Sequence, residues 1–352
     1  MSEINYNALE GHIQTRVPSP VYLICGDEGY LRRRSLEMLK AAYLPTFMPE
    51  FNYSEFDGAE CTVDEIAAAV ETLPVMTERR MVLVKDLDAA AIGAEQYRKL
   101  ETLLNSLREF GDTCVLIFFN VSVKSSAKGG DKQGAMRALI KKQGTVINCK
   151  TPSPAEIADL LTTEARGMNA QLSRADAAYL VERCGTDITN LLSELAKLRS
   201  LCGGKITRAA IDGNTTQSVD VKAYMLASNV IQGKRREAFV IMEELFEERT
   251  EPVAVLAIMS GAFVDLYRAK LAAAERKNAE DMTDIFGDEY KGKEKRLSFS
   301  FRDSRRYSTE LLRQWCLLLC ETDAALKSSR VDSKILLEKT LAEMFVMAER
   351  YR

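Results

Sequence analysis

The feature that most constrains the fold is a series of short apolar runs separated by longer, helix-like segments over the first 150 residues. Runs that are apolar throughout are typical of strands buried on both faces, and such strands belong to parallel sheets covered by helices. The predicted strands cover 21–25, a weaker alternating run at 51–56, 81–84, 114–119 and 145–149. We therefore expect residues 1–150 to form an α/β domain with a five-stranded parallel sheet.

Helix and loop signals fill the intervals between these strands. Thr62 and Glu65 have the spacing of a capping box, which predicts a helix that runs to about Glu71. Between 123 and 133 the chain turns to Lys, Ser and Gly, which indicates an exposed loop. The basic residues of that loop are Lys124, Lys128 and Lys132.

Pro152 and Pro154 mark a domain boundary, because two prolines this close interrupt both helix and sheet. No strand is predicted beyond them. Helices over 155–166, 174–184 and 187–201, with a short one after the cap at Thr207, predict a small helical domain at 151–215. The last domain, 216–352, is predicted to be all-α, with helices at 219–232, 234–248, 252–278, 308–328 and 331–350.

Two residue patterns on which many enzymes depend are missing from the sequence. His12 is the only histidine, so acid–base or nucleophilic catalysis through histidine is not expected. No cluster of carboxylates has metal-ligand spacing, which argues against a nuclease or a transferase. The sequence thus predicts no catalytic residue, no metal and no cofactor.

The cysteines favour a reduced protein. Cys25, Cys114 and Cys149 lie inside apolar runs, where a free thiol packs as a small hydrophobic side chain. Cys316 and Cys320 are four residues apart, but no second pair follows them, so a zinc site is the weaker interpretation.

Charge and hydropathy limit the partners and the compartment. A formal net charge of −3 excludes a uniformly basic nucleic-acid binder but allows a local basic patch. No apolar run approaches the roughly 18–20 residues of a membrane helix. Glu3 and Glu10 interrupt the N-terminal segment where a signal peptide needs apolar residues. We expect a cytoplasmic protein.

The first predicted strand ends at Gly26 and leads into a helix, which is where a phosphate-binding loop would lie. The segment 26–32 lacks the Lys and Ser/Thr of such a loop, and Asp27 and Glu28 would repel phosphate. Asp86 follows a buried strand like a magnesium-binding acid, but Leu87 replaces the catalytic Glu. We expect no ATP hydrolysis.

Several segments, taken in order, carry a resemblance to a known family. The first is the apolar strand that ends at Gly26 and is followed by two acidic residues, Gly29, and then Tyr30-Leu31. The full set is 21–31, 71–84, 185–198, 305–308 and 323–327. Together they resemble the DNA polymerase III delta subunits of bacterial clamp loaders.

The resemblance implies an AAA+-like α/β domain without a phosphate-binding loop, a helical lid domain and an all-α collar domain. It implies a protein that binds and opens the sliding clamp (beta) for loading onto primed DNA, without its own ATP hydrolysis. The implied partners are the clamp, the motor subunits tau or gamma, delta prime, and primed DNA within the complex.

Leu73, Val75 and Met76 correspond to the clamp-binding segment of that family, with Pro74 restricting the backbone between them. The resemblance implies that these apolar side chains enter a hydrophobic pocket on the clamp. The residues alone favour another interpretation, in which all three complete the core of the first domain.

Arg302, Arg305 and Arg306 are candidates for DNA contact. Between 291 and 306 lie seven basic and two acidic residues, close to Phe299, Phe301 and Tyr307. The alternative for this stretch is a solvated loop between helices, anchored by its aromatic residues.

Two other functions remain open from the sequence. An active AAA+ ATPase would bind nucleotide, which the missing Lys and Ser/Thr argue against. A helical adaptor or regulatory protein on a degenerate AAA+ scaffold, unconnected with replication, would have no affinity for a sliding clamp.

Overall fold

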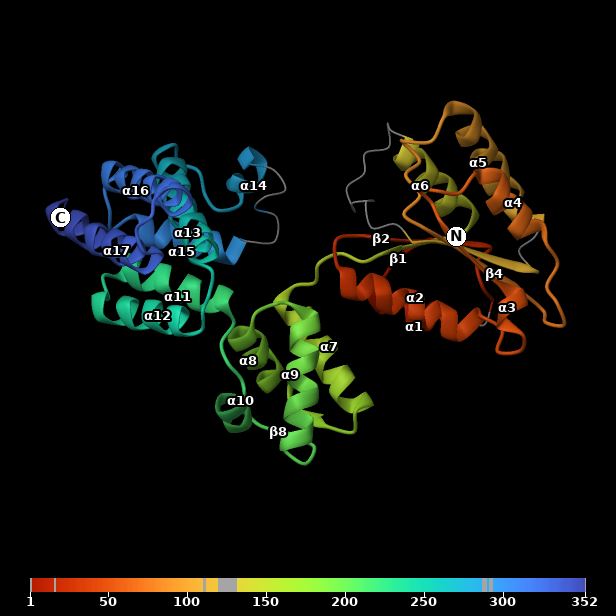
Figure 1. Ribbon diagram of the computed structural model, residues 1–352, viewed down its shortest axis with the longest axis horizontal. Helices are drawn as coiled ribbons and strands as arrows, with labels where there is room; N and C mark the ends of the chain where they lie inside the picture. The colour runs from red at the N-terminus through yellow and green to blue at the C-terminus, as the bar shows by residue number, and fades with distance from the viewer. Residues whose placement is uncertain are drawn as a thin grey trace. The chain divides into compact units, whose positions relative to one another are not determined.

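The computed structural model describes residues 2–15, 17–109, 112–119, 132–286, 290 and 294–351. The chain divides into two compact units, Met1–Pro152 and Ser153–Arg352, which are treated separately below (Figure 1).

The first unit is built on a parallel sheet, as predicted, but the sheet has six strands where the sequence predicted five. The additional strand, β1, lies at one edge and pairs with β6, with Ile4 opposite Ile147. It has four residues and one apolar side chain, so it lacks the continuous apolar signal of a buried strand. In spatial order the strands are β1 (Ser2–Asn5), β6 (Thr145–Asn148), β2 (Val21–Cys25), β5 (Cys114–Phe119), β4 (Arg80–Lys85) and β3 (Tyr53–Asp57).

Helices cover both faces of this sheet, which explains why β2 and β5, at its centre, are apolar throughout. Figure 1 shows α2 (Gly29–Tyr43) on one side and α4 (Val63–Glu71), α5 (Ala94–Ser106) and α6 (Lys132–Gln143) on the other. α1 (Tyr6–Gln14) packs beside α2, and the short segments α3 (Pro49–Asn52) and η1 (Leu107–Glu109) complete the unit. The predicted capping box is present, since the Thr62 side chain accepts from the Glu65 amide and the Glu65 carboxylate accepts from the Thr62 amide.

The edge strand β1 is attached through Glu3. Its carboxylate accepts hydrogen bonds from Arg137 at 2.6 Å, Lys141 at 3.0 Å and Asn148 at 3.1 Å. Burial opposes ionisation of Glu3, but these hydrogen bonds and the charge of Arg137 prevail and lower its pKa from 4.5 to about 2. The ionised carboxylate therefore stabilises the folded state at neutral pH.

We expect Glu3→Gln to lower the free energy of unfolding of this unit by about 1–3 kcal/mol at pH 7. Because the folded-state pKa is depressed, the stabilisation is complete above pH 4.5 and is lost as the pH falls towards 2. Urea unfolding of both proteins between pH 7 and pH 2 measures this, and the two curves should converge at the acid end. A constant difference across that range would contradict the role of the charge.

The second unit begins with four helices, and those predicted from the sequence are confirmed to within a residue or two. They are α7 (Pro154–Gly167), α8 (Arg174–Cys184), α9 (Ile188–Leu201) and α10 (Arg208–Asn214). The prediction of no strand here is wrong, because β7 (Gln171–Leu172) pairs with β8 (Lys205–Ile206). Two residues per strand are too few to produce a periodic signal. The division of 153–352 into lid and collar domains stays a prediction.

The remainder of this unit is helical, and its five long predicted helices are present. They are α11 (Val219–Gln232), α12 (Arg235–Glu247), α13 (Pro252–Ala274), α16 (Thr309–Ser328) and α17 (Ser333–Arg350). Two helices were not predicted, α14 (Asp281–Phe286) and α15 (Glu294–Ser304). α15 replaces much of the expected loop, because Leu297, Phe301 and Ser304 lie on one helical face that packs inward.

The helix α13 corrects the expectation that no apolar run is as long as a membrane helix. By length and composition it is the one helix in the described part of the chain that could cross a membrane, contrary to the expectation that no run approaches that length. It packs against α11, α15 and α16, and Met259 and Phe263 lie in the core of the unit. The core helix of a globular protein meets the same criteria, so the finding is weak support for a membrane span.

Three cysteines are buried thiols, as predicted. Burial raises the pKa of Cys25 and Cys149 to about 11 and that of Cys114 to about 12, so all three are protonated at neutral pH. Cys316 and Cys320 lie one turn apart on α16, and burial raises the pKa of Cys316 to about 11. Within the described ranges no group of three His, Cys, Asp or Glu residues is placed to hold a metal ion.

Candidate functional site

The connection between α4 and β4 presents apolar side chains to solvent. Leu73, Val75 and Met76 are 72%, 40% and 79% exposed. Residues 73–76 are called the apolar segment below. They do not complete the core of the first unit, which was the interpretation that the residues alone favoured. An exposed apolar group of this kind on a folded unit is typical of an interaction site.

Two buried side chains hold the apolar segment from within the unit. Arg80 donates to the carbonyl oxygen of Thr72 at 3.4 Å and to the Ser54 hydroxyl at 2.8 Å. Asn52 accepts from the amide of Val75 at 2.8 Å and donates to the carbonyl oxygen of Val75 at 3.0 Å. The backbone is therefore tied to neighbouring elements at Thr72, just before the segment, and at Val75 within it.

The structure also places α3 beside the apolar segment, which sequence reasoning missed. The strand predicted over 51–56 begins at Tyr53, and Phe51 and Asn52 belong to α3. Phe47 and Phe51 are 54% and 57% exposed, so more apolar surface lies in and just before this short helix. Asn52 of α3 and Val75 of the apolar segment are 23 residues apart in the sequence. Their contact can therefore be seen only in the folded structure.

In the turn after β2, the backbone amides of Glu28 and Tyr30 already have hydrogen-bond partners within the protein. In a phosphate-binding loop, such amides are left free to bind phosphate. The amide of Glu28 donates to the carbonyl oxygen of Cys149 at 3.0 Å, and the amide of Tyr30 donates to the Glu28 carboxylate at 3.0 Å. Gly26 has φ of 122°, and a Cβ atom there would lie 2.3 Å from the Cys149 oxygen. The carboxylate of Glu28 thus occupies the helix N-terminus that would otherwise attract an anion.

The end of β4 carries the two residues that the sequence compared with a magnesium-binding strand. Asp86 has a left-handed backbone, with φ of 51°, and its amide donates to the carbonyl oxygen of Phe119 at 2.9 Å. Leu87, which stands in place of a catalytic Glu, is fully buried in the apolar core.

The predicted DNA-contact residues lie at the end of α15 and just after it. Arg302 and Arg305 line an open depression of about 630 Å³ together with Arg276 and Lys277. Arg302, Arg306 and Lys234 line a second depression of about 430 Å³. These six residues are called the basic surface below.

The aromatic residues near the basic surface have different roles. Phe299 is 52% exposed, and the guanidinium of Arg302 lies 5.1 Å from its ring centre. Phe301 and Tyr307 pack inward, and the Tyr307 hydroxyl donates to the carbonyl oxygen of Ile231 at 2.6 Å. Of the three aromatics named from the sequence, Phe299 is thus the one available to stack on a base. Lys124 and Lys128 lie outside the described residues.

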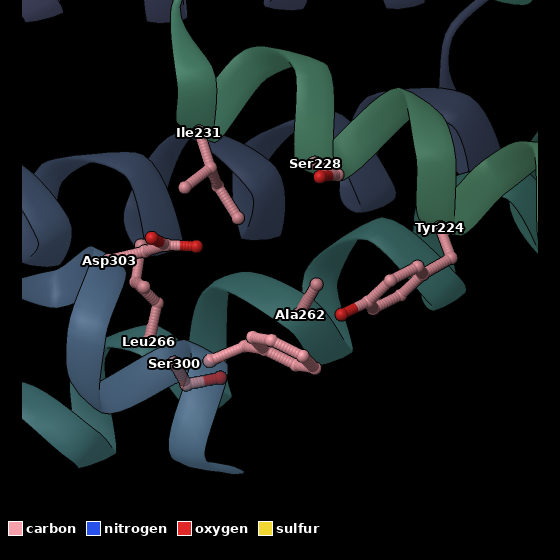
Figure 2. A pocket seen from close by; sticks show the side chains of 8 residues that line it. Tyr224, Ser228, Ile231, Ala262, Leu266, Ser300 and Asp303 are labelled. Carbon is pink, nitrogen blue, oxygen red and sulfur yellow. The ribbon is translucent and has the colours of Figure 1, made fainter. Parts of the chain in front are cut away.

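A small cavity lies close to the basic surface, between α11, α13 and α15, and its lining includes Tyr224, Ala262 and Asp303 (Figure 2). Its volume of about 30 Å³ accommodates water. Small-molecule sites are typically about 300–1,000 Å³. This cavity is therefore too small for a nucleotide.

Comparisons with known proteins match one family along nearly the whole chain. The family model "DNA polymerase III, delta subunit" matches residues 22–150, and "DNA polymerase III delta subunit, C-terminal domain" matches residues 220–344. The chain is 23% identical to DNA polymerase III subunit delta of Bacillus subtilis over 333 residues, 94% of each chain. It is also 23% identical to the Escherichia coli delta subunit over 225 residues, 61% of this chain and 64% of that one.

A solved structure has the same fold. The Bacillus subtilis DNA clamp loader delta protein superposes with a TM-score of 0.68 at 21% identity, covering 97% of this chain and 99% of that one. The fold class expected from the sequence, an α/β unit of the AAA+-like clamp-loader type followed by helical regions, is confirmed. The chain belongs to the family of DNA polymerase III delta subunits.

Proposed function

We propose that this chain is a clamp-loader delta subunit, which binds and opens the sliding clamp for loading onto primed DNA without hydrolysing ATP itself. The observation that carries the proposal is the exposure of Leu73, Val75 and Met76. Their segment is held by hydrogen bonds to the carbonyl oxygen of Thr72, just before it, and to the backbone of Val75. The names of the relatives support it, since one is a clamp loader delta protein and two are delta subunits of DNA polymerase III.

Apolar side chains on a held segment suit docking into a hydrophobic pocket. Full burial of each side chain contributes roughly 1.5–3 kcal/mol, so Val75 and Met76 are enough to dominate a small interface. A segment that is already ordered loses less conformational entropy on binding than a free loop.

Opening a ring needs no covalent chemistry. A protein that binds the opened clamp more tightly than the closed clamp shifts the equilibrium by the difference between the two affinities. The satisfied amides of Glu28 and Tyr30 and the burial of Leu87 support a chain without its own ATP hydrolysis. We propose that ATP is bound by the motor subunits tau or gamma, which join this chain and delta prime in a cytoplasmic complex.

Release of the clamp from DNA tests the proposal. The cognate clamp, labelled with a fluorophore, is placed on nicked circular DNA, and its dissociation is followed with this chain and no nucleotide. We expect the chain to accelerate dissociation, and we expect ATP to leave the rate unchanged. An unchanged dissociation rate would sink the proposed opening activity, and a rate that needed ATP would favour the active-ATPase alternative.

A contact between the basic surface and DNA is a second proposal. The observation that favours it is that Arg276, Lys277 and Lys234 line the same depressions as the three predicted arginines. Each phosphate contact that is lost lowers the magnitude of the negative slope of log affinity against log salt concentration by about 0.7–0.9.

We expect Arg305→Glu with Arg306→Glu to weaken binding of a primed oligonucleotide at least tenfold at about 0.1 M salt and to flatten its salt dependence. Fluorescence anisotropy at several salt concentrations measures both. Arg330→Glu with Lys339→Glu makes the same charge change at exposed positions that line neither depression. Equal losses in the two double variants would mean that net charge, and not the basic surface, determines binding.

A further inference from the structure

Asn52 is a buried polar residue whose side-chain amide is directed at the apolar segment. Its side chain is 0% exposed and makes three hydrogen bonds. Its carboxamide oxygen accepts from the Val75 amide at 2.8 Å, and its nitrogen donates to the carbonyl oxygens of Val75 at 3.0 Å and Met48 at 3.2 Å. One side chain therefore binds both the amide and the carbonyl group of Val75, within the apolar segment.

The backbone of the apolar segment needs such a partner. It follows the end of α4 and precedes β4, so neither a helix nor a sheet ladder pairs the amide and carbonyl of Val75. A carboxamide both donates and accepts, and it can therefore take the place of a neighbouring strand at one residue. Met48 and Met76, on either side of this contact, have left-handed backbones with φ of 48° and 53°. Non-glycine residues keep that conformation only where their surroundings hold it.

We infer that Asn52 is a positioning residue for the apolar segment, because it holds Val75 and Met76 in a conformation ready to dock on the clamp. Asn52 itself is too deeply buried to touch the clamp. The inference rests on the proposed function, because it assigns to Asn52 a share of the affinity for the clamp. Without the carboxamide, the segment keeps its apolar side chains but must be ordered during binding, and ordering backbone residues opposes association.

Asn52→Ala provides the test, with clamp affinity measured by calorimetry and global stability by thermal unfolding. We expect the dissociation constant to rise about tenfold or more. The matched control is Asn148→Ala, which removes another largely buried carboxamide from the same unit, one that donates to Glu3 at 3.1 Å. The control is expected to lower stability and leave clamp affinity unchanged.

Amide hydrogen exchange gives a readout that does not depend on a variant folding. In the free wild-type chain the Val75 amide is expected to exchange slowly, because it donates to Asn52. In Asn52→Ala this protection should disappear, while the amides of Met81, Val82 and Leu83 in β4 stay protected. Free exchange of the Val75 amide in the wild type would overturn the inference even if Asn52→Ala proved unable to fold.

The outcomes separate this inference from the function on which it rests. Weak binding by a folded Asn52→Ala, normal binding by Asn148→Ala and protection of Val75 support it. Equal clamp affinity in the wild type and Asn52→Ala overturns the positioning role and leaves the clamp-binding proposal intact. No binding by the wild type overturns the proposed function, whatever the variants do.

Discussion

Replacing Val75 and Met76 together with serine is expected to abolish binding of the sliding clamp and to leave the protein folded. The two side chains are 40% and 79% exposed, so little core packing is lost. Each apolar side chain removed from a buried interface lowers the binding free energy by roughly 1.5–3 kcal/mol. Because part of each side chain is already buried in the free chain, the pair accounts for roughly 2–4 kcal/mol, or about 30- to 10³-fold in the dissociation constant.

The measurement is calorimetric titration of the variant with the clamp, alongside circular dichroism. The matched control is Val17→Ser, which changes another exposed apolar residue of the same unit, 71% exposed. Leu73→Ser is titrated separately, because the contribution of Leu73 is a distinct proposal. Wild-type affinity in the folded double variant would place the clamp contact elsewhere on the chain. Loss of the fold would mean that these side chains support the core after all.

Replacing Trp315 with alanine is expected to lower the free energy of unfolding of the helical unit by about 3–5 kcal/mol. The indole is fully buried, and its Nε1–H donates to the carbonyl oxygen of Met344 at 3.0 Å. Its ring meets Phe263 and Tyr307 edge-on, with centroid distances of 5.3 and 4.9 Å. The residue thus joins α13, α16, α17 and the turn before α16, and alanine would leave a cavity and remove the hydrogen bond to Met344.

Thermal and urea unfolding followed by circular dichroism measure this loss. Leu317→Ala, on the same helix but 44% exposed, is the control and should cost much less. Below the unfolding transition, Trp315→Ala is expected to bind the clamp with wild-type affinity, because the proposed contact lies in the other unit. A stability loss no larger than that of Leu317→Ala would contradict the packing described here.

The sheet was predictable to the extent that its strands are buried on both faces. β2 and β5 are apolar throughout and β4 is apolar from Met81 to Val84, so all three can be recognised without tertiary information. β1 could not be predicted from the sequence, because a four-residue edge strand has no continuous apolar pattern. Only its pairing with β6 defines it as a strand. α15 was missed because its basic residues suggested a solvated loop, whereas the packing of Leu297 and Phe301 makes it a helix.

The candidate site was predictable only in part. The apolar residues of the segment could be identified by family resemblance, but their exposure depends on how the finished core excludes them. Asn52 carries no local signal, because an asparagine between a phenylalanine and a strand is unremarkable until the fold brings Val75 beside it. The basic surface likewise depends on α13 bringing Arg276 and Lys277 to the side of Arg302 and Arg305.

The measurement that tests the central claim most directly is calorimetric titration of the wild-type chain with its cognate sliding clamp in the absence of nucleotide. We expect saturable binding, because the apolar segment is exposed and ordered in the free chain. A folded chain that released no heat and showed no binding by an independent method would contradict the account. It would favour an adaptor that uses the same scaffold away from the clamp.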